Sequence, residues 1–176
     1  SASYLDQSMM DNSTMVDAKL NGASLWAAKI SYANLTGASL ARAFMIRTTF
    51  HKSQLNGANL TGAILVGANF INASVIHADL SGADLSESRC SGANFSGSRL
   101  VNSTLNFANL TRADLSNANL SDSHLVASRL DDSNLTKANL SNANLENAFM
   151  RRVNLVGAKL SGANLPGSRL DDSDLS

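Results

Sequence analysis

Few residues of this chain could carry out chemistry, and they are scattered along it. The chain has one cysteine, Cys90, which excludes an intrachain disulfide and a cysteine-based metal cluster. Acid–base catalysis by paired carboxyl groups requires an environment that raises one of the two pKa values, whereas we expect the neighbouring Asp131 and Asp132 to be solvated. No serine stands out as a nucleophile beside histidine and aspartate partners. We therefore predict no catalytic residue and no cofactor-binding residue.

A five-residue period positions the side chains. Between residues 80 and 100 every fifth residue is apolar, and the residue two places before each of them is small. We call each such fifth residue a centre. The register runs from Leu5 to Leu175 without insertion or deletion, which a disordered chain of low complexity would not maintain. The centres of this segment are Leu80, Leu85, Cys90, Phe95 and Leu100.

A period of five matches neither a helix nor a strand. A short extended piece followed by a turn, repeated many times, would point every centre at one axis, so the pattern predicts a solenoid. All 11 glycines stand two places after a centre, where a turn residue with positive φ favours Gly and then Asn. The only proline, Pro166, stands one place after a centre, where the turn needs a φ of about −65°.

Composition argues against several classes of protein. Fourteen basic residues balance 14 acidic ones, so no net field attracts nucleic acid or an anionic membrane. No apolar run approaches the roughly 18 residues of a membrane span, and there is no signal-peptide core. Because the sequence begins at Ser1 without a methionine, we expect a processed or shortened chain from which a targeting segment can be absent. For these residues we expect a cytoplasmic location.

The units ANLTG (58–62), ADLSG (78–82), ANFSG (93–97) and ANLSN (138–142) resemble the A(D/N)LXX units of the pentapeptide-repeat family. The resemblance covers the whole chain. It implies an all-β fold, a right-handed quadrilateral parallel β-helix with one pentapeptide per side and 20 residues per coil. The chain would then make about nine coils and one uninterrupted domain over residues 1–176, a rod on the order of 40 Å long.

Stacking residues 20 apart sorts the centres onto four sides. The second-side centres vary most in size, and there Cys90 stacks beside Phe70, so we predict a buried and inert thiol. The histidines fall on three different sides, which argues against a shared metal site. They are His51, His77 and His124. We number the four sides by their first centres, which are Leu5, Met10, Met15 and Leu20.

Charged residues collect on the second side. Two places after its centres the sign of the charge alternates from coil to coil, and further charges lie beside them. We predict a structural surface ladder whose exposed pairs each contribute about 0–1 kcal/mol. Arg89, Arg129 and Arg169 on this side could bind an anionic partner, but the interleaved aspartates weaken that interpretation. The predicted ladder comprises Arg112, Asp131, Asp132, Arg151, Arg152, Asp171 and Asp172.

Outward positions lie one before, one after and two after each centre. On the first side they hold a group of apolar residues, and an exposed apolar group on a rod usually marks a contact surface. We expect a protein partner or a second copy of the chain to bind there, unless a segment of the full-length protein covers it. The predicted contact residues are Trp26, Phe44, Ile46, Ile64 and Val66.

These observations predict a non-catalytic protein-interaction or scaffold module without a cofactor. Its partner is not identified by the sequence, and either the apolar group or an open end of the rod could support a homodimer. The resemblance implies one alternative, a DNA-mimicking inhibitor or protector of a type II topoisomerase such as gyrase. The balanced charge and the absence of an interrupting loop argue against it. A third interpretation is the β-helix domain of a larger bacterial effector.

Overall fold

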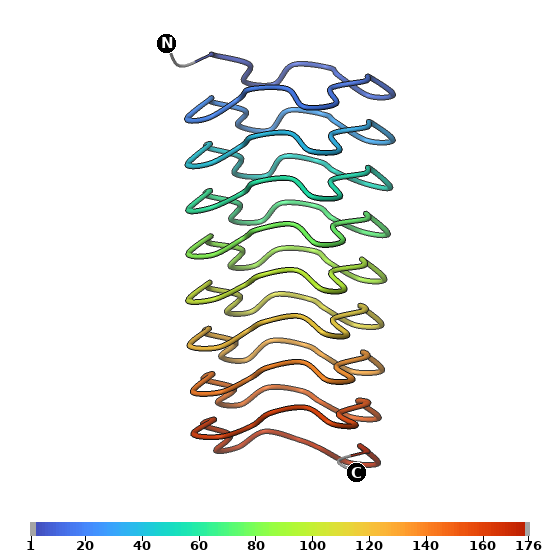
Figure 1. Cartoon of the computed structure of the whole chain (residues 1–176), viewed down its shortest axis with the longest axis vertical. Coiled ribbons are helices and arrows are strands. Elements are labelled where there is room, and N and C mark those ends of the chain that lie inside the picture. Colours follow the sequence, from blue (N-terminus) through green and yellow to red (C-terminus); the bar gives the residue numbers. More distant parts are fainter. Residues whose placement is uncertain (1–2, 175–176) are drawn as a thin grey trace.

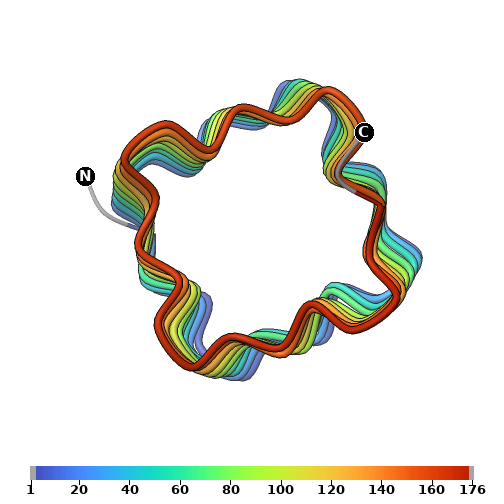
Figure 2. The ribbon, with the colours of Figure 1, turned by 90° about the horizontal axis from the view of Figure 1, so that it is seen from below.

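The computed structural model describes residues 3–174. They form a rod of stacked coils with the two ends of the chain at opposite ends of the rod (Figure 1). Viewed along the rod, the coils superimpose in a four-sided outline (Figure 2). The architecture is the predicted right-handed, all-β quadrilateral helix. The last centre of the predicted register, Leu175, lies outside the described residues.

Each side of a coil contributes one β-bridge residue, the residue just before a centre. Within residues 3–174 there is no helix and no longer strand. Every bridge is parallel and joins residues 20 apart, from Tyr4 with Ser24 to Asn154 with Asp174. This confirms the predicted coil of 20 residues with one pentapeptide per side.

A turn with one positive φ forms each corner. The amide N–H of Ala28 donates to the carbonyl of the centre Leu25 at 3.0 Å, and the same bond recurs at corners along the rod. Each described residue two places after a centre has a positive φ, as predicted for Gly and Asn. The slot also holds other types, for example Ala127 at 53° and Phe107 at 61°. None of its described occupants is β-branched, because a branched Cβ fits this conformation poorly.

Main-chain hydrogen bonds tie each coil to its neighbours. The amide of the centre Leu25 donates to Phe44 at 2.8 Å, and the amide of Phe44 donates back to Ala23 at 2.9 Å. The amide of Ala27 donates to Ile46 at 2.9 Å. With the turn bond, four of the five amides in a unit are thus satisfied by the backbone. Only the amide one place after the centre needs a side chain or water as acceptor.

Asparagine and aspartate supply that acceptor in two ways. When the residue before the centre is Asn or Asp, its own side chain accepts, as Asn59 Oδ1 does from the amide of Thr61 at 3.0 Å. When it is not, a side chain one coil earlier can substitute. Ser74 precedes a centre, and there Asn56 Oδ1 accepts both the amide of Ile76 at 3.1 Å and the hydroxyl of Ser74 at 2.7 Å. The side chains that act in this second way are Asp6, Asn21, Asn56, Asn106, Asp11 and Asp131.

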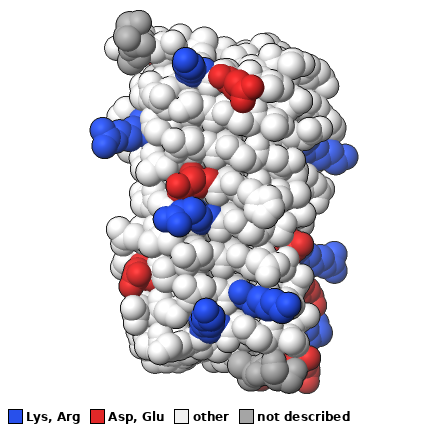
Figure 3. Space-filling model, viewed as in Figure 1, with Lys and Arg blue, Asp and Glu red and all other residues white. Residues whose placement is uncertain are grey.

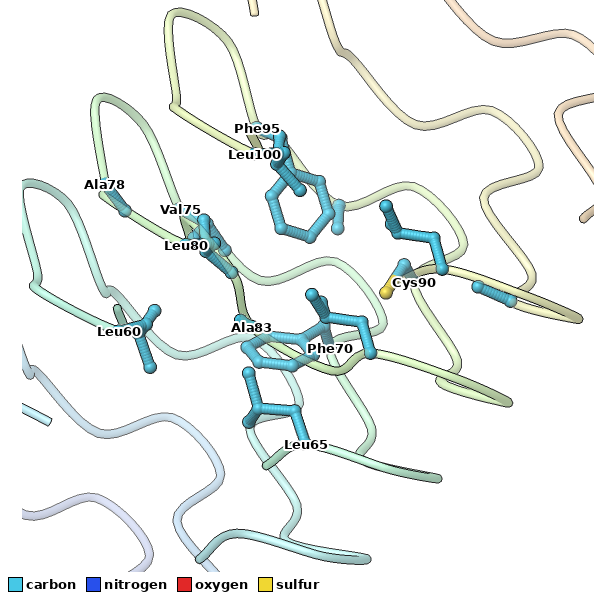
Figure 4. Packing of buried hydrophobic residues seen from close by; sticks show 14 of the residues in the cluster. Leu60, Leu65, Phe70, Val75, Ala78, Leu80, Ala83, Cys90, Phe95 and Leu100 are labelled. Atoms are coloured by element: carbon cyan, nitrogen blue, oxygen red, sulfur yellow. The ribbon is translucent and has the colours of Figure 1, made fainter. Parts of the chain in front are cut away.

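The centres fill the interior. Every centre from Leu25 to Leu155 is at most 2% exposed, and no pocket is found among the described residues. The rings of Phe50 and Phe70 stack at 4.9 Å between centroids, and Phe70 lies near Cys90 (Figure 4). The pKa of the Cys90 thiol is raised to about 12. Burial is the main cause, and a contact with the Ser88 hydroxyl at 3.3 Å offsets part of its effect. The thiol is therefore buried and protonated at neutral pH, as predicted.

Candidate protein-contact surface

The five apolar residues predicted on the first side lie together in three successive coils. Phe44 pairs with Ile64 in a parallel bridge, and the amide of Ala27, next to Trp26, donates to the carbonyl of Ile46. Phe44 is 50% exposed and Trp26 is 42% exposed. The remaining members are half-buried. We call these five residues the apolar patch: Trp26, Phe44, Ile46, Ile64 and Val66.

The structure adds one residue to this surface that the sequence prediction missed. Tyr4 is 83% exposed, and it belongs to the same column as Phe44 because both form bridges with Ser24. The 20-residue spacing from Tyr4 through Ser24 to Phe44 was a signal that could have found it. Tyr4 therefore adds an exposed aromatic side chain to the first side in the first described coil, separated from Phe44 by Ser24.

Two backbone donors lie within the apolar patch. The amides of Ile46 and Val66 donate no hydrogen bond to any residue in 3–174. The reason is local, because neither the preceding Phe44 and Ile64 nor the residues one coil earlier carry the side-chain acceptor used elsewhere. A partner that covers the patch would have to present oxygen acceptors to these two amides as well as apolar side chains.

The charge ladder on the second side forms two ion pairs. Arg152 binds Asp132 with two parallel bonds, Nε to Oδ1 at 2.7 Å and Nη2 to Oδ2 at 3.0 Å. Arg151 donates to Asp131 Oδ1 from Nε at 3.1 Å and from its amide at 3.2 Å. The other three predicted members make no ion pair shorter than 4.0 Å within the described part of the chain. They are Arg112, Asp171 and Asp172.

The prediction that Asp131 is solvated was wrong. Asp131 is only 4% exposed, whereas the side chain of Asp132 is 30% exposed. Asp131 is covered because its carboxylate accepts from Arg151 of the next coil and lies 4.0 Å from Nη2 of Arg129. Its Oδ2 atom accepts no hydrogen bond from the described residues. This aspartate is a structural acceptor held between two arginines.

We expect the Asp132 carboxyl to titrate below the ordinary aspartate range. The hydrogen bonds from Arg152 lower its pKa most, desolvation opposes them, and the charges of Arg152, Arg112 and Arg151 lower the pKa further. The pKa of Asp132 is lower in the folded than in the unfolded protein, so ionised Asp132 stabilises the fold. This stabilisation is fully present above the unfolded pKa and is lost as the pH falls through the folded pKa. Carbon-detected NMR titration of the Asp132 carboxyl measures the shift.

The matched variant for this titration is Arg152→Gln. It should bring the Asp132 midpoint back toward the ordinary aspartate value, and the stability difference between wild type and variant should vanish in acid. An Asp132 midpoint that is the same in both proteins would contradict the role given to the Arg152 pair.

The remaining candidate groups for chemistry do not converge. His51, His77 and His124 lie on three different sides, and residues 3–174 contain no group of three potential metal ligands. His51 instead contacts the ring of Tyr32 edge-on, with centroids 5.6 Å apart. The described residues include no helix that is long and apolar enough to cross a membrane.

Charges of both signs are spread over the surface. The face shown in Figure 3 carries basic and acidic side chains, several of them beside one of opposite sign, with uncharged surface between these groups. That face has no continuous acidic stripe.

Comparison with known proteins identifies related sequences along most of the chain. The family model described as pentapeptide repeats matches in eight copies. No curated protein sequence matches the chain. The matched residues are 28–65, 63–101, 88–126, 98–136 and 138–176.

Two solved structures share the architecture. HetL, a pentapeptide repeat protein involved in regulation of heterocyst differentiation in the cyanobacterium Nostoc sp. strain PCC 7120, is 25% identical with a TM-score of 0.71. The match covers 98% of this chain and 86% of HetL. QnrB1, a plasmid-mediated fluoroquinolone resistance protein, is 16% identical with a TM-score of 0.52, over 96% of this chain and 89% of QnrB1. The second match concerns the fold alone.

Proposed function

The chain belongs to the pentapeptide-repeat family, and from this membership we propose that it acts as a rigid, non-catalytic module that binds another protein. The apolar patch carries the proposal, because large apolar side chains are exposed together on one side of the rod. The involvement of HetL in the regulation of differentiation is consistent with such a module. The dispersed histidines and the buried, protonated Cys90 thiol give no support to catalysis.

The free energy of this contact would come mainly from Trp26 and Phe44. An aromatic residue that passes from half-exposed to fully buried in an interface is a typical hot spot, and hot spots contribute about 2 kcal/mol or more each. The open amides of Ile46 and Val66 would add directional bonds. A contact of this composition depends little on salt, because its main component is apolar burial.

Exchange of Trp26→Gln together with Ile46→Gln is expected to weaken association about 100-fold or more, because it removes two apolar members of the patch. The first measurement is solution mass by size exclusion with light scattering, over a range of concentration and at low and high salt. If the wild type is monomeric, the same proteins serve as bait in an extract of the source organism. A retained protein should then be lost with the double variant.

Val101→Gln is the matched control, since Val101 holds the position of Trp26 and Ile46 on the fourth side and is half-buried there. Circular dichroism should show the same fold in all three proteins. Association that is equally strong in the double variant and the control would overturn the patch as the contact surface.

The topoisomerase alternative has less support. A mimic of duplex DNA needs a dense acidic face, whereas Asp131 and Asp132 of the second side are paired with Arg151 and Arg152. The similarity to QnrB1 concerns the fold alone. The interpretation as one domain of a larger effector is compatible with the patch, which could then contact another part of that protein.

A further inference from the structure

A column of arginines runs along the second side in alternate coils. The bridge pairs join Arg89 to Asn109, Asn109 to Arg129, Arg129 to Phe149 and Phe149 to Arg169. No acidic residue interrupts this column. Stacked strands lie about 4.8 Å apart, so the backbone positions of successive arginines in this column are about 10 Å apart. We call Arg89, Arg129 and Arg169 the arginine column.

These guanidinium groups are largely free to bind a partner. Arg89 and Arg169 are exposed and make no ion pair with the described residues. Arg169 lies over the ring of Phe149, 5.6 Å from its centroid, which orients the side chain without neutralising it. The side chain of Arg129 is 58% exposed, and its nearest carboxylate oxygen lies at 4.0 Å.

The neighbouring aspartates compete less than the sequence suggested. Asp131 is buried against Arg151, and Asp132 is held by two bonds from Arg152. Asp132 is thus occupied by an arginine outside the column, whereas Asp131 is shared between Arg151 and, at 4.0 Å, Arg129 of the column. The objection that interleaved aspartates neutralise the column therefore loses weight at Asp132, while Asp171 and Asp172 form no ion pair within the described residues.

We propose that the arginine column binds an acidic protein segment in the polyproline II conformation, with a carboxylate at every third residue. This helix has three residues per turn and rises about 9 Å per turn, so every third side chain lies on one face at nearly the spacing of the arginines. Guanidinium groups bind carboxylates through paired hydrogen bonds. A nucleic acid strand fits less well, because its phosphates follow at about 3.4 Å along the axis and most of them would face no arginine.

The direct test is fluorescence anisotropy with a labelled (Glu-Pro-Pro)4 peptide. Arg89→Gln with Arg169→Gln is expected to weaken binding about 5-fold to 20-fold, because each exposed ion pair contributes a factor of about 2–5. Binding should also weaken as salt is raised. This variant leaves Arg129 and its contact with Asp131 intact, so it should fold, and adding Arg129→Gln should weaken binding further.

Matched controls separate spacing and location from net charge. A peptide of the same composition with its four glutamates adjacent should bind more weakly than the periodic one. The variant Arg42→Gln with Lys159→Gln removes the same charge from the fourth side and should bind like the wild type. The Trp26→Gln and Ile46→Gln variant should also bind normally, so this inference and the proposed function can fail separately.

Several outcomes would overturn the arginine column as a polyproline II site. They are no binding of the periodic peptide, equal binding of the clustered peptide, and full binding by the variant that lacks Arg89 and Arg169. Stronger binding of a helical peptide with glutamates seven residues apart, or of duplex DNA, would assign the column to a different partner.

Discussion

Replacing Phe70 by alanine is expected to lower the free energy of unfolding by about 3–5 kcal/mol. Phe70 is fully buried, stacks on Phe50 at 4.9 Å and lies 6.2 Å from the ring of Phe95. The wall of the rod cannot close over the cavity, since each coil is fixed by main-chain hydrogen bonds to the coils on both sides. Urea denaturation followed by circular dichroism measures the loss. The dependence of the unfolding free energy on urea concentration should be the same in variant and wild type, which shows that both unfold in the same way.

Phe107→Ala is the control for this substitution. It removes the same side chain from a position that is 64% exposed, so the expected change is within about 0.5 kcal/mol. A similar cost for the two variants, or a cost below about 1 kcal/mol for Phe70→Ala, would contradict a rigid interior packed around the aromatic centres.

Two neighbouring proline substitutions should have opposite outcomes. Asn102→Pro is expected to cost about 3 kcal/mol or more, because Asn102 has a φ of 54° and its amide donates to Ser121 at 3.0 Å. Val101→Pro should change stability by less than about 1 kcal/mol. The amide of Val101 donates to no residue in 3–174, and Pro166 already occupies the equivalent turn position.

Thermal and urea unfolding of both variants provide the measurement. Because the two positions are adjacent in the same turn, the comparison isolates the backbone requirement from differences in burial. If Val101→Pro were as damaging as Asn102→Pro, the assignment of a proline-compatible φ and an unbonded amide to the first turn position would be wrong.

The fold could be predicted because one signal is repeated in nearly every unit. Leu80, Gly82 and Ala83 each occupy a slot with one requirement: an apolar centre, a positive φ or a small wall residue. Each requirement was visible in the sequence and is confirmed in the structure. The handedness and the four sides came from the family resemblance and not from the spacing.

Features that depend on two coils at once were harder to predict. The burial of Asp131 requires Arg129 of its own coil and Arg151 of the next, and solvation is the default for an isolated Asp-Asp pair. The open amides of Ile46 and Val66 reflect acceptors that are missing both beside them and one coil earlier. The sequence placed the five patch residues on one side, and the same 20-residue spacing places Tyr4 in their column, whereas its 83% exposure is given by the structure.

The two ways of satisfying the turn amide have a consequence for how such a rod can evolve. Loss of an Asn or Asp before a centre is harmless once an Asn or Asp stands 18 positions earlier, as Asn56 does for Ser74 and Asn106 does for His124. Substitutions at these paired positions are therefore not independent. A repeat that departs from the consensus can still have its turn amide satisfied by a side chain of the preceding coil. We therefore expect these two positions, 18 residues apart, to change together in related sequences.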